Sequence, residues 1–343
     1  HRQVNICNAC RYCEGYCDVF PAITRNRTFA AGDLTQLANL CHNCQGCYHA
    51  CQYAPPHEFA LNLPAVLAEL RQESWAELAW PGGLAPLFQR HGLAVAGLLV
   101  AGLAALFWAV AALPGEGEGF YAALSHGAMV AIFLPAFLFP LASLAISLRA
   151  YWRRVGGEAL RLADWRDALA ATARMKNLSG GQGQGCNYEK GDRFSNARRI
   201  AHQLTLGGFL LCFASTSAGT ILHYALGLEA PYGLWSLPKL LGVPGGLLLA
   251  AGTLWLAWLK TRADRSLGAA AHWGGEMAFV LLLAFVAISG LVLYWATGSA
   301  LVPGLLAVHL GAVLAFFLLM PYSKMAHGFY RFAALLRDAQ LRR

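Results

Sequence analysis

Long apolar stretches dominate the chain beyond its first ninety residues. Six of them are free of Asp, Glu, Lys and Arg, and each has roughly the 20 residues that a helix needs to cross the hydrocarbon core of a bilayer. They are residues 93–113, 127–148, 203–222, 240–259, 277–296 and 301–323. Hydrophobic residues make up 57% of the chain and charged residues 13%. We therefore expect a mainly α protein with six transmembrane helices.

The basic residues lie in alternate connections between these stretches, which is typical of the cytoplasmic side of a membrane protein. Residues 149–201 carry 11 Lys and Arg, the loop 260–271 carries three and the tail 324–343 carries five, whereas the connections on the opposite side carry only Lys239. This bias predicts that both termini are cytoplasmic. The net charge of +8 is then a sign of topology, and it does not indicate a nucleic-acid-binding patch.

Eight of the ten cysteines lie in two matched runs near the N-terminus. Each run has the spacing C-x2-C-x2-C-x3-C; the first contains Cys7, Cys10, Cys13 and Cys17, and the second contains Cys41, Cys44, Cys47 and Cys51. A [4Fe–4S] cluster needs four thiolates, and with this spacing the fourth cysteine usually ligates the other cluster. We predict that Cys7, Cys10, Cys13 and Cys51 hold one cluster, and that Cys41, Cys44, Cys47 and Cys17 hold the second.

Zinc and disulfides are the alternative explanations of so many cysteines. Zinc ligands usually come as C-x2-C pairs separated by a dozen or more residues, not as runs of three with a fourth close behind. Disulfides need an oxidising compartment, whereas the charge bias places these thiols in the cytoplasm. Proline follows each run at the same offset, at Pro21 and Pro55. The two halves therefore form a pseudo-repeat, which resembles the α-helical ferredoxin domain of respiratory iron–sulfur subunits.

Four histidines near the ends of two apolar stretches are candidate haem ligands. His309 and His327 are five helical turns apart, so one continuous helix would place both on the same face. His202 and His223 bracket the third stretch, which runs in the opposite direction. We expect His202 to pair with His327 in the inner leaflet and His223 with His309 in the outer leaflet. Two such pairs fit two b-type haems, although a histidine at the end of a span is often only an interfacial anchor.

These patterns divide the chain into three parts. Residues 1–62 are predicted to form a helical ferredoxin domain with two [4Fe–4S] clusters, and residues 63–92 an amphipathic linker. Residues 93–343 are predicted to form a cytochrome b-like haem domain of six spans with a basic cytoplasmic loop at 149–201. The linker lies either on the membrane surface or against the ferredoxin core. The run of glycines at 180–185 lacks the βαβ context of a phosphate loop, so we interpret it as a flexible segment.

Several sites remain open at this stage. His126 and His272 are reserve haem ligands, and Cys186 has no assigned role. Lys239 and Tyr232 on the outer side, and His272 and Glu276 on the inner side, are candidate entry points for protons.

The last apolar stretch resembles the haem-bearing last helix of the respiratory nitrate reductase gamma subunit, which has two histidines at the separation of His309 and His327 and a Pro-x-Ser near the second. The whole chain is similar to the family of B proteins of bacterial tricarballylate and citrate utilisation. The stretches that carry this likeness are the two cysteine runs and residues 185–188, 198–202, 208–216, 223–224, 230–232, 237–242 and 309–331.

The resemblance implies an electron-transfer subunit in the bacterial inner membrane. A cytoplasmic FAD-dependent dehydrogenase, which oxidises tricarballylate or a citrate-like acid, would deliver electrons that pass through two [4Fe–4S] clusters and heme b (one or two) to quinone. The substrate chemistry would belong to that partner, so no catalytic residue is expected in this chain. Two alternatives stay open: a quinol-oxidising subunit that feeds a cytoplasmic reductase, and a non-catalytic membrane anchor.

Overall fold

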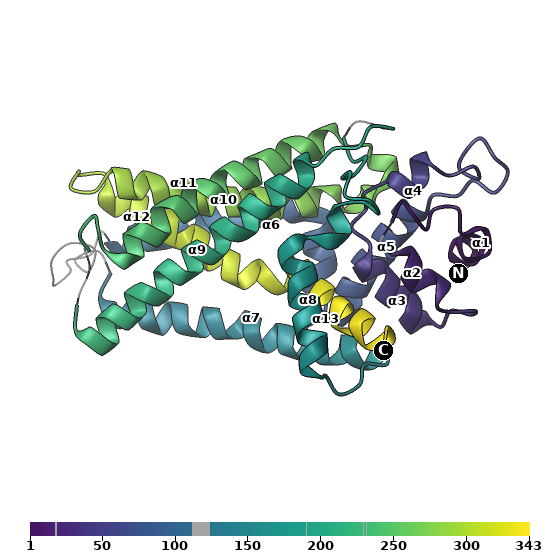
Figure 1. Cartoon of the computed structure of the whole chain (residues 1–343). Coiled ribbons are helices and arrows are strands. Elements are labelled where there is room, and N and C mark those ends of the chain that lie inside the picture. Colours follow the sequence, from purple (N-terminus) through teal and green to yellow (C-terminus); the bar gives the residue numbers. More distant parts are fainter. Residues whose placement is uncertain (18, 112–123, 190, 229, 231) are drawn as a thin grey trace.

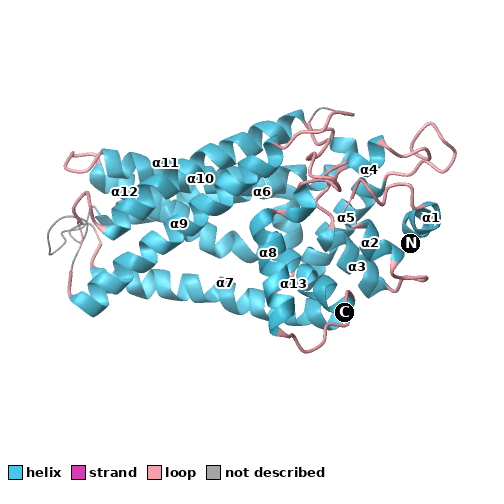
Figure 2. Cartoon of the chain, viewed as in Figure 1, coloured by secondary structure: helices cyan, strands magenta, loops and turns pink. Residues whose placement is uncertain are grey.

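The computed structural model describes residues 1–17, 19–111, 124–189, 191–228, 230 and 232–343. Within these residues the regular structure is helical (Figure 2), and one isolated antiparallel bridge joins Cys186 to Ser195. Asp18, Pro231 and most of the connection after the first span lie outside the described residues. The prediction of a mainly α protein is confirmed.

Four short helices form the N-terminal cysteine domain. They are α1 (Arg2–Cys10), α2 (Phe20–Thr24), α3 (Ala31–Leu40) and α4 (Gly46–His49). The fifth helix, α5 (Leu63–Leu78), begins where Asn62 accepts a hydrogen bond from the Ala65 N–H, a typical N-terminal cap. It packs on α3, and the Nε1 of its buried Trp75 donates to Asn39 Oδ1 at 2.8 Å. The amphipathic segment therefore packs against the cysteine domain, which is one of the two positions predicted for it.

Six long helices follow among the described residues, and all are long and apolar enough to cross a membrane. They are α6 (Leu84–Ala111), α7 (His126–Arg154), α9 (Ala197–Leu226), α10 (Leu237–Arg262), α11 (Trp273–Trp295) and α12 (Val302–Leu319). They run along the length of the molecule, and both termini lie at the end that carries the cysteine domain (Figure 1). The predicted number of spans agrees with the structure in length and composition.

The chain does not continue as one helix between His309 and His327. Helix α12 ends at Leu319, a 3-10 turn covers Met320–Tyr322, and Ser323 is extended before α13 (Ala326–Leu341) begins. Pro321 has no N–H and so cannot continue the helical hydrogen bonds. The prediction of a single helix through both histidines is wrong. Instead, α13 packs against α3, α7 and α8 (Leu162–Arg174).

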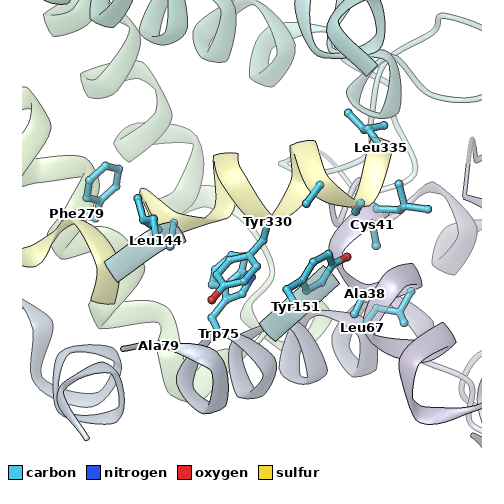
Figure 3. Packing of buried hydrophobic residues seen from close by; sticks show 14 of the residues in the cluster. Ala38, Cys41, Leu67, Trp75, Ala79, Leu144, Tyr151, Phe279, Tyr330 and Leu335 are labelled. Carbon is cyan, nitrogen blue, oxygen red and sulfur yellow. The ribbon is translucent and has the colours of Figure 1, made fainter. Parts of the chain in front are cut away.

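A buried aromatic cluster joins the cysteine domain to the bundle. Trp75 of α5 stacks on Tyr330 of α13 with ring centroids 6.3 Å apart, and Tyr151 of α7 meets Tyr330 edge-on at 5.5 Å (Figure 3). The Tyr151 hydroxyl donates to Gln36 Oε1, and Gln36 Nε2 donates to Ala334 O at 2.6 Å. Each polar group of this cluster named here has a hydrogen-bond partner, as buried polar groups need. The cluster fixes the cysteine domain to the bundle.

Glycines allow α9 and α10 to approach closely. A Cβ atom on Gly208 would collide with the backbone of Leu249 and lie 2.7 Å from Gly245 O, whereas a Cβ atom on the adjacent Gly207 would meet nothing within 4 Å. We expect Gly208→Ala to destabilise the protein by about 1–3 kcal/mol, because the overpacked helices must separate. Gly207→Ala is the matched control and should be neutral or slightly stabilising. Thermal unfolding of the detergent-solubilised variants measures both; equal melting temperatures would contradict this packing.

Candidate cofactor sites

The eight cysteines of the two runs lie in two groups, and each group combines both runs. The Cys17 thiol is hydrogen-bonded to Cys44 and interacts electrostatically with Cys41 and Cys47. The thiols of Cys7 and Cys13 interact in the same way with Cys10 and Cys51. We call Cys7, Cys10, Cys13 and Cys51 the distal group, and Cys17, Cys41, Cys44 and Cys47 the proximal group. This grouping is the one that cross-ligation of two clusters requires; ligation itself stays a prediction.

Crowded thiols govern the electrostatics of both groups. Burial, together with the neighbouring thiols, raises the pKa of Cys7 to about 12 and the pKa of Cys13 to about 11. Burial also raises the pKa of Cys47 well above its usual value. The pKa of Cys44 falls to about 6, chiefly because the Cys17 thiol donates a hydrogen bond to its sulfur. A bound cationic group reverses such shifts, since a coordinating thiol is deprotonated outright.

Each group supplies the four thiols that a [4Fe–4S] cluster needs. Among the described residues, no three His, Cys, Asp or Glu side chains converge on a position for one metal ion. In a [4Fe–4S] cluster the four thiolates need not converge on one point, because each ligates its own iron. Backbone N–H groups also point at the sulfurs: Val19 N lies 3.4 Å from Cys17 Sγ, and Asn43 N lies 3.3 Å from Cys41 Sγ. Such bonds help to set cluster potentials.

Arginines hold the proximal group against the bundle. Arg71 of α5 and Arg331 of α13 both donate to the carbonyl oxygen of Cys41, at 2.6 Å and 2.8 Å. Arg198 of α9 donates to Asn43 O at 2.8 Å. Three helices thus converge on one short stretch of the second cysteine run, and each brings a positive charge to it.

The structure brings the predicted inner histidines together. The ring centroids of His202 and His327 are 5.8 Å apart, with the rings 73° from parallel. Two imidazoles that share one metal at about 2 Å each have ring centroids about 6 Å apart. Lys324 O is the partner of His327 Nδ1, which leaves Nε2 for a ligand; histidines that bind metals commonly use their other ring nitrogen in this way. The buried Nδ1 of His202 has no hydrogen-bond partner. The pair therefore fits an iron between its rings.

The outer histidines differ from the predicted pairing. The ring of His223 lies 4.3 Å from that of His126, which the sequence offered only as a reserve ligand. His309 Nδ1 lies 3.0 Å from Ser289 Oγ on α11, so its Nε2 is also left for a ligand. A Cβ atom on Gly290 would lie 3.0 Å from the His309 ring, so this glycine makes room for the imidazole. Three histidines are thus candidates for an outer haem.

A partly buried cluster of charges lies at the end of the bundle next to the cysteine domain. Glu276 Oε2 is 2.5 Å from Lys260 Nζ and 3.0 Å from Lys324 Nζ, and Glu276 Oε1 accepts from Gln72 at 2.8 Å. A cavity of about 10 Å³ adjoins Glu276, Gln72 and Lys324, which is room for about one water molecule. At the opposite end of the bundle, Tyr232 donates to Gly219 O, and Lys239 lies over the ring of Tyr294.

Fold and sites together define a class: a helical protein with six potential membrane spans and an N-terminal domain of the ferredoxin type. Residues 1–77 match the family described as citrate utilization protein B Fer4-like domain, and residues 81–343 match citrate utilization protein B. The chain is 40% identical over 344 residues to citrate utilization protein B of Escherichia coli, which covers 98% of this chain and 90% of that protein. The chain belongs to the citrate utilization protein B family, as the sequence motifs indicated. No solved structure matches it.

Double cysteine variants distinguish cross-ligation from ligation within each run. If Cys17 belongs with the second run, Cys17→Ser/Cys41→Ser removes one cluster and about four of about eight irons, whereas Cys10→Ser/Cys17→Ser removes both clusters. Ligation within each run predicts the reverse. Anaerobic iron and acid-labile sulfide assays measure the loss. Cys212→Ser, in the middle of α9, is the control and should retain all the iron.

Glu276 is the counter-ion of the buried Lys260 and of Lys324, which is partly exposed. Glu276→Gln should destabilise the protein by about 3 kcal/mol, because it leaves these two like charges side by side without a counter-ion. A thermal melt in detergent measures this. Glu73→Gln, on the exposed side of α5, is the control, and adding Lys260→Met to Glu276→Gln should recover part of the loss. A melt of Glu276→Gln like that of Glu73→Gln would show that the cluster is solvated.

Proposed function

We propose that this protein carries electrons from a cytoplasmic FAD-dependent dehydrogenase to the quinone pool of the bacterial inner membrane. The dehydrogenase would oxidise citrate, tricarballylate or a similar acid, in keeping with the name of the relative from Escherichia coli. When bound, two [4Fe–4S] clusters and b-type haem would supply the one-electron carriers. This chain would fix the distances between them and tune their potentials through ligands, burial and hydrogen bonds.

The observation that carries the proposal is the continuity between the proximal group and the inner histidines. His42 follows Cys41 directly, and burial lowers its pKa well below the usual value, with further contributions from Arg331, Arg198 and the rings of His202 and His327. Cys41 belongs to the proximal group, and the adjacent His42 lies within electrostatic range of the histidine pair. Such a short connection is what electron transfer between a cluster and a haem needs.

The distal group suits the entry of electrons. It is built around α1, which lies at the end of the molecule away from the six long helices (Figure 1). A flavoprotein could approach there without meeting the membrane. The basic segment after α7 lies on the same side as the cysteine domain, where Arg154 pairs with Glu77 of α5 at 2.6 Å. This supports a cytoplasmic position for both termini, since basic loops mark that side.

Histidine variants test the haem assignment. We expect His202→Ala and His327→Ala each to abolish the inner b-type haem and quinone reduction, because an axial ligand is lost, while both clusters remain. A reduced-minus-oxidised spectrum with pyridine haemochrome and iron assays measures this in detergent-purified protein. His91→Ala, at the exposed kink of α6, is the control. Full haem content in both inner variants would refute the assignment.

The haem contents of two further variants distinguish the possible ligand pairs at the outer site. His309→Ala should remove one haem if His309 is an axial ligand, and His126→Ala should leave the haem content unchanged if His223 pairs with His309. If His126→Ala loses the haem and His309→Ala keeps it, the outer pair is His126 and His223.

A further inference from the structure

The glycine-rich loop before α9 is folded over the cysteine domain and is not the flexible segment that its composition predicts. The Gly181 N–H donates to Tyr16 O at 3.2 Å, and the Asn187 N–H donates to Cys44 O at 2.8 Å. Cys186 and Ser195 exchange two backbone hydrogen bonds of 2.9 Å. A side chain on Gly181 would collide with the backbone of Gly15, between Cys13 and Cys17. The glycines are therefore needed for close approach.

Asn187 lies at the centre of this contact. Its side chain is 1% exposed, and neither Oδ1 nor Nδ2 has a hydrogen-bond partner in the protein. The amide lies against Gly46, since a Cβ atom there would be 3.2 Å from Asn187 Oδ1. Gly46 separates Cys44 from Cys47, two cysteines of the proximal group. Buried amides are nearly always hydrogen-bonded, so the unpaired Nδ2 of this one is a donor available to a group bound beside these two cysteines.

We propose that the Asn187 amide donates a hydrogen bond to a sulfur of the proximal cluster and raises the reduction potential of that cluster above the potential of the distal one. This rests on the proposed function, which places a cluster on the proximal group. Hydrogen bonds to sulfur are among the factors that set cluster potentials. A donor stabilises the reduced cluster more than the oxidised one, because the reduced cluster carries one more negative charge.

The charges around the two groups also favour a higher reduction potential at the proximal cluster. Arg71, Arg331 and Arg198 bring three positive charges to the backbone of the proximal group. At the distal group, Gln52 Nε2 lies 3.8 Å from Cys10 Sγ, a long contact to a neutral donor. Electrons would therefore run downhill from the distal to the proximal cluster and on towards His202 and His327.

Redox titration of the two clusters by electron paramagnetic resonance tests the role of Asn187 in the full-length protein. Asn187→Leu keeps the size of the side chain but removes the donor, so the higher of the two potentials should fall while the lower one stays. Asn187→Asp replaces the donor by a negative charge and should lower the same potential further. Iron and sulfide contents, measured on the same samples, should equal those of the wild type.

Asn177→Ala is the matched control. Asn177 also ties this loop to the cysteine domain, through a 3.0 Å hydrogen bond to Leu40 O, but it donates to a carbonyl and not towards the cysteine groups. An equal shift in Asn177→Ala would mean that loosening of the loop, not a lost donor, moves the potential, and would overturn the proposal. Unchanged potentials in both Asn187 variants would also overturn it. If Asn187→Leu loses a cluster, the potentials measured for Asn187→Asp alone test the proposal.

A failure of the proposed function itself looks different. Wild-type protein without two iron–sulfur clusters would remove the basis of both proposals. Wild-type protein with both clusters and unaltered potentials in the Asn187 variants would remove only this one.

Discussion

The hydrogen bonds from Arg71 and Arg331 to the carbonyl oxygen of Cys41 are the contact on which the rest of the arrangement depends. One guanidinium comes from α5 and the other from α13, so a single peptide group joins the cysteine domain to the end of the bundle. Charge-assisted bonds of this kind are roughly twice as strong as neutral ones. They also place positive charge where thiolates and clusters would add negative charge, and each burial makes the other less costly.

The break at Pro321 has the same importance for the histidines. Without this break, the residues up to His327 and Arg331 would continue along the axis of α12. The 3-10 turn and the extended Ser323 instead redirect the chain, and α13 packs between α3 and α8. His327 then meets His202, and Arg331 reaches Cys41. The predicted inner pair therefore forms although the helix between His309 and His327 is interrupted.

Local patterns in the sequence were sufficient for the elements but not for their contacts. Six apolar runs predict six spans because burial in lipid selects composition directly, and cysteine spacing predicts the two thiol groups because three ligands lie in one tight loop. The partner of His223 could not be predicted this way, since it depends on how α7 and α9 are rotated. The prediction of a flexible Gly-rich loop failed for another reason. Glycine occurs both in flexible linkers and where two backbones pack closely. The close backbone contacts at Gly15 and Gly185 show that the loop is packed.

That loop also shows why the two halves of the protein act as one unit. The chain covers the proximal cysteines with Asn187, anchors Asn43 through Arg198, and four residues later presents His202 on α9. Arg198 is held on the ring of Tyr188 at 3.9 Å, so the cover and the helix cannot move independently. Any displacement of the cysteine domain would therefore alter the position of a haem-ligand candidate. A rigid connection of this kind keeps a distance between redox centres constant, which a flexible linker cannot do.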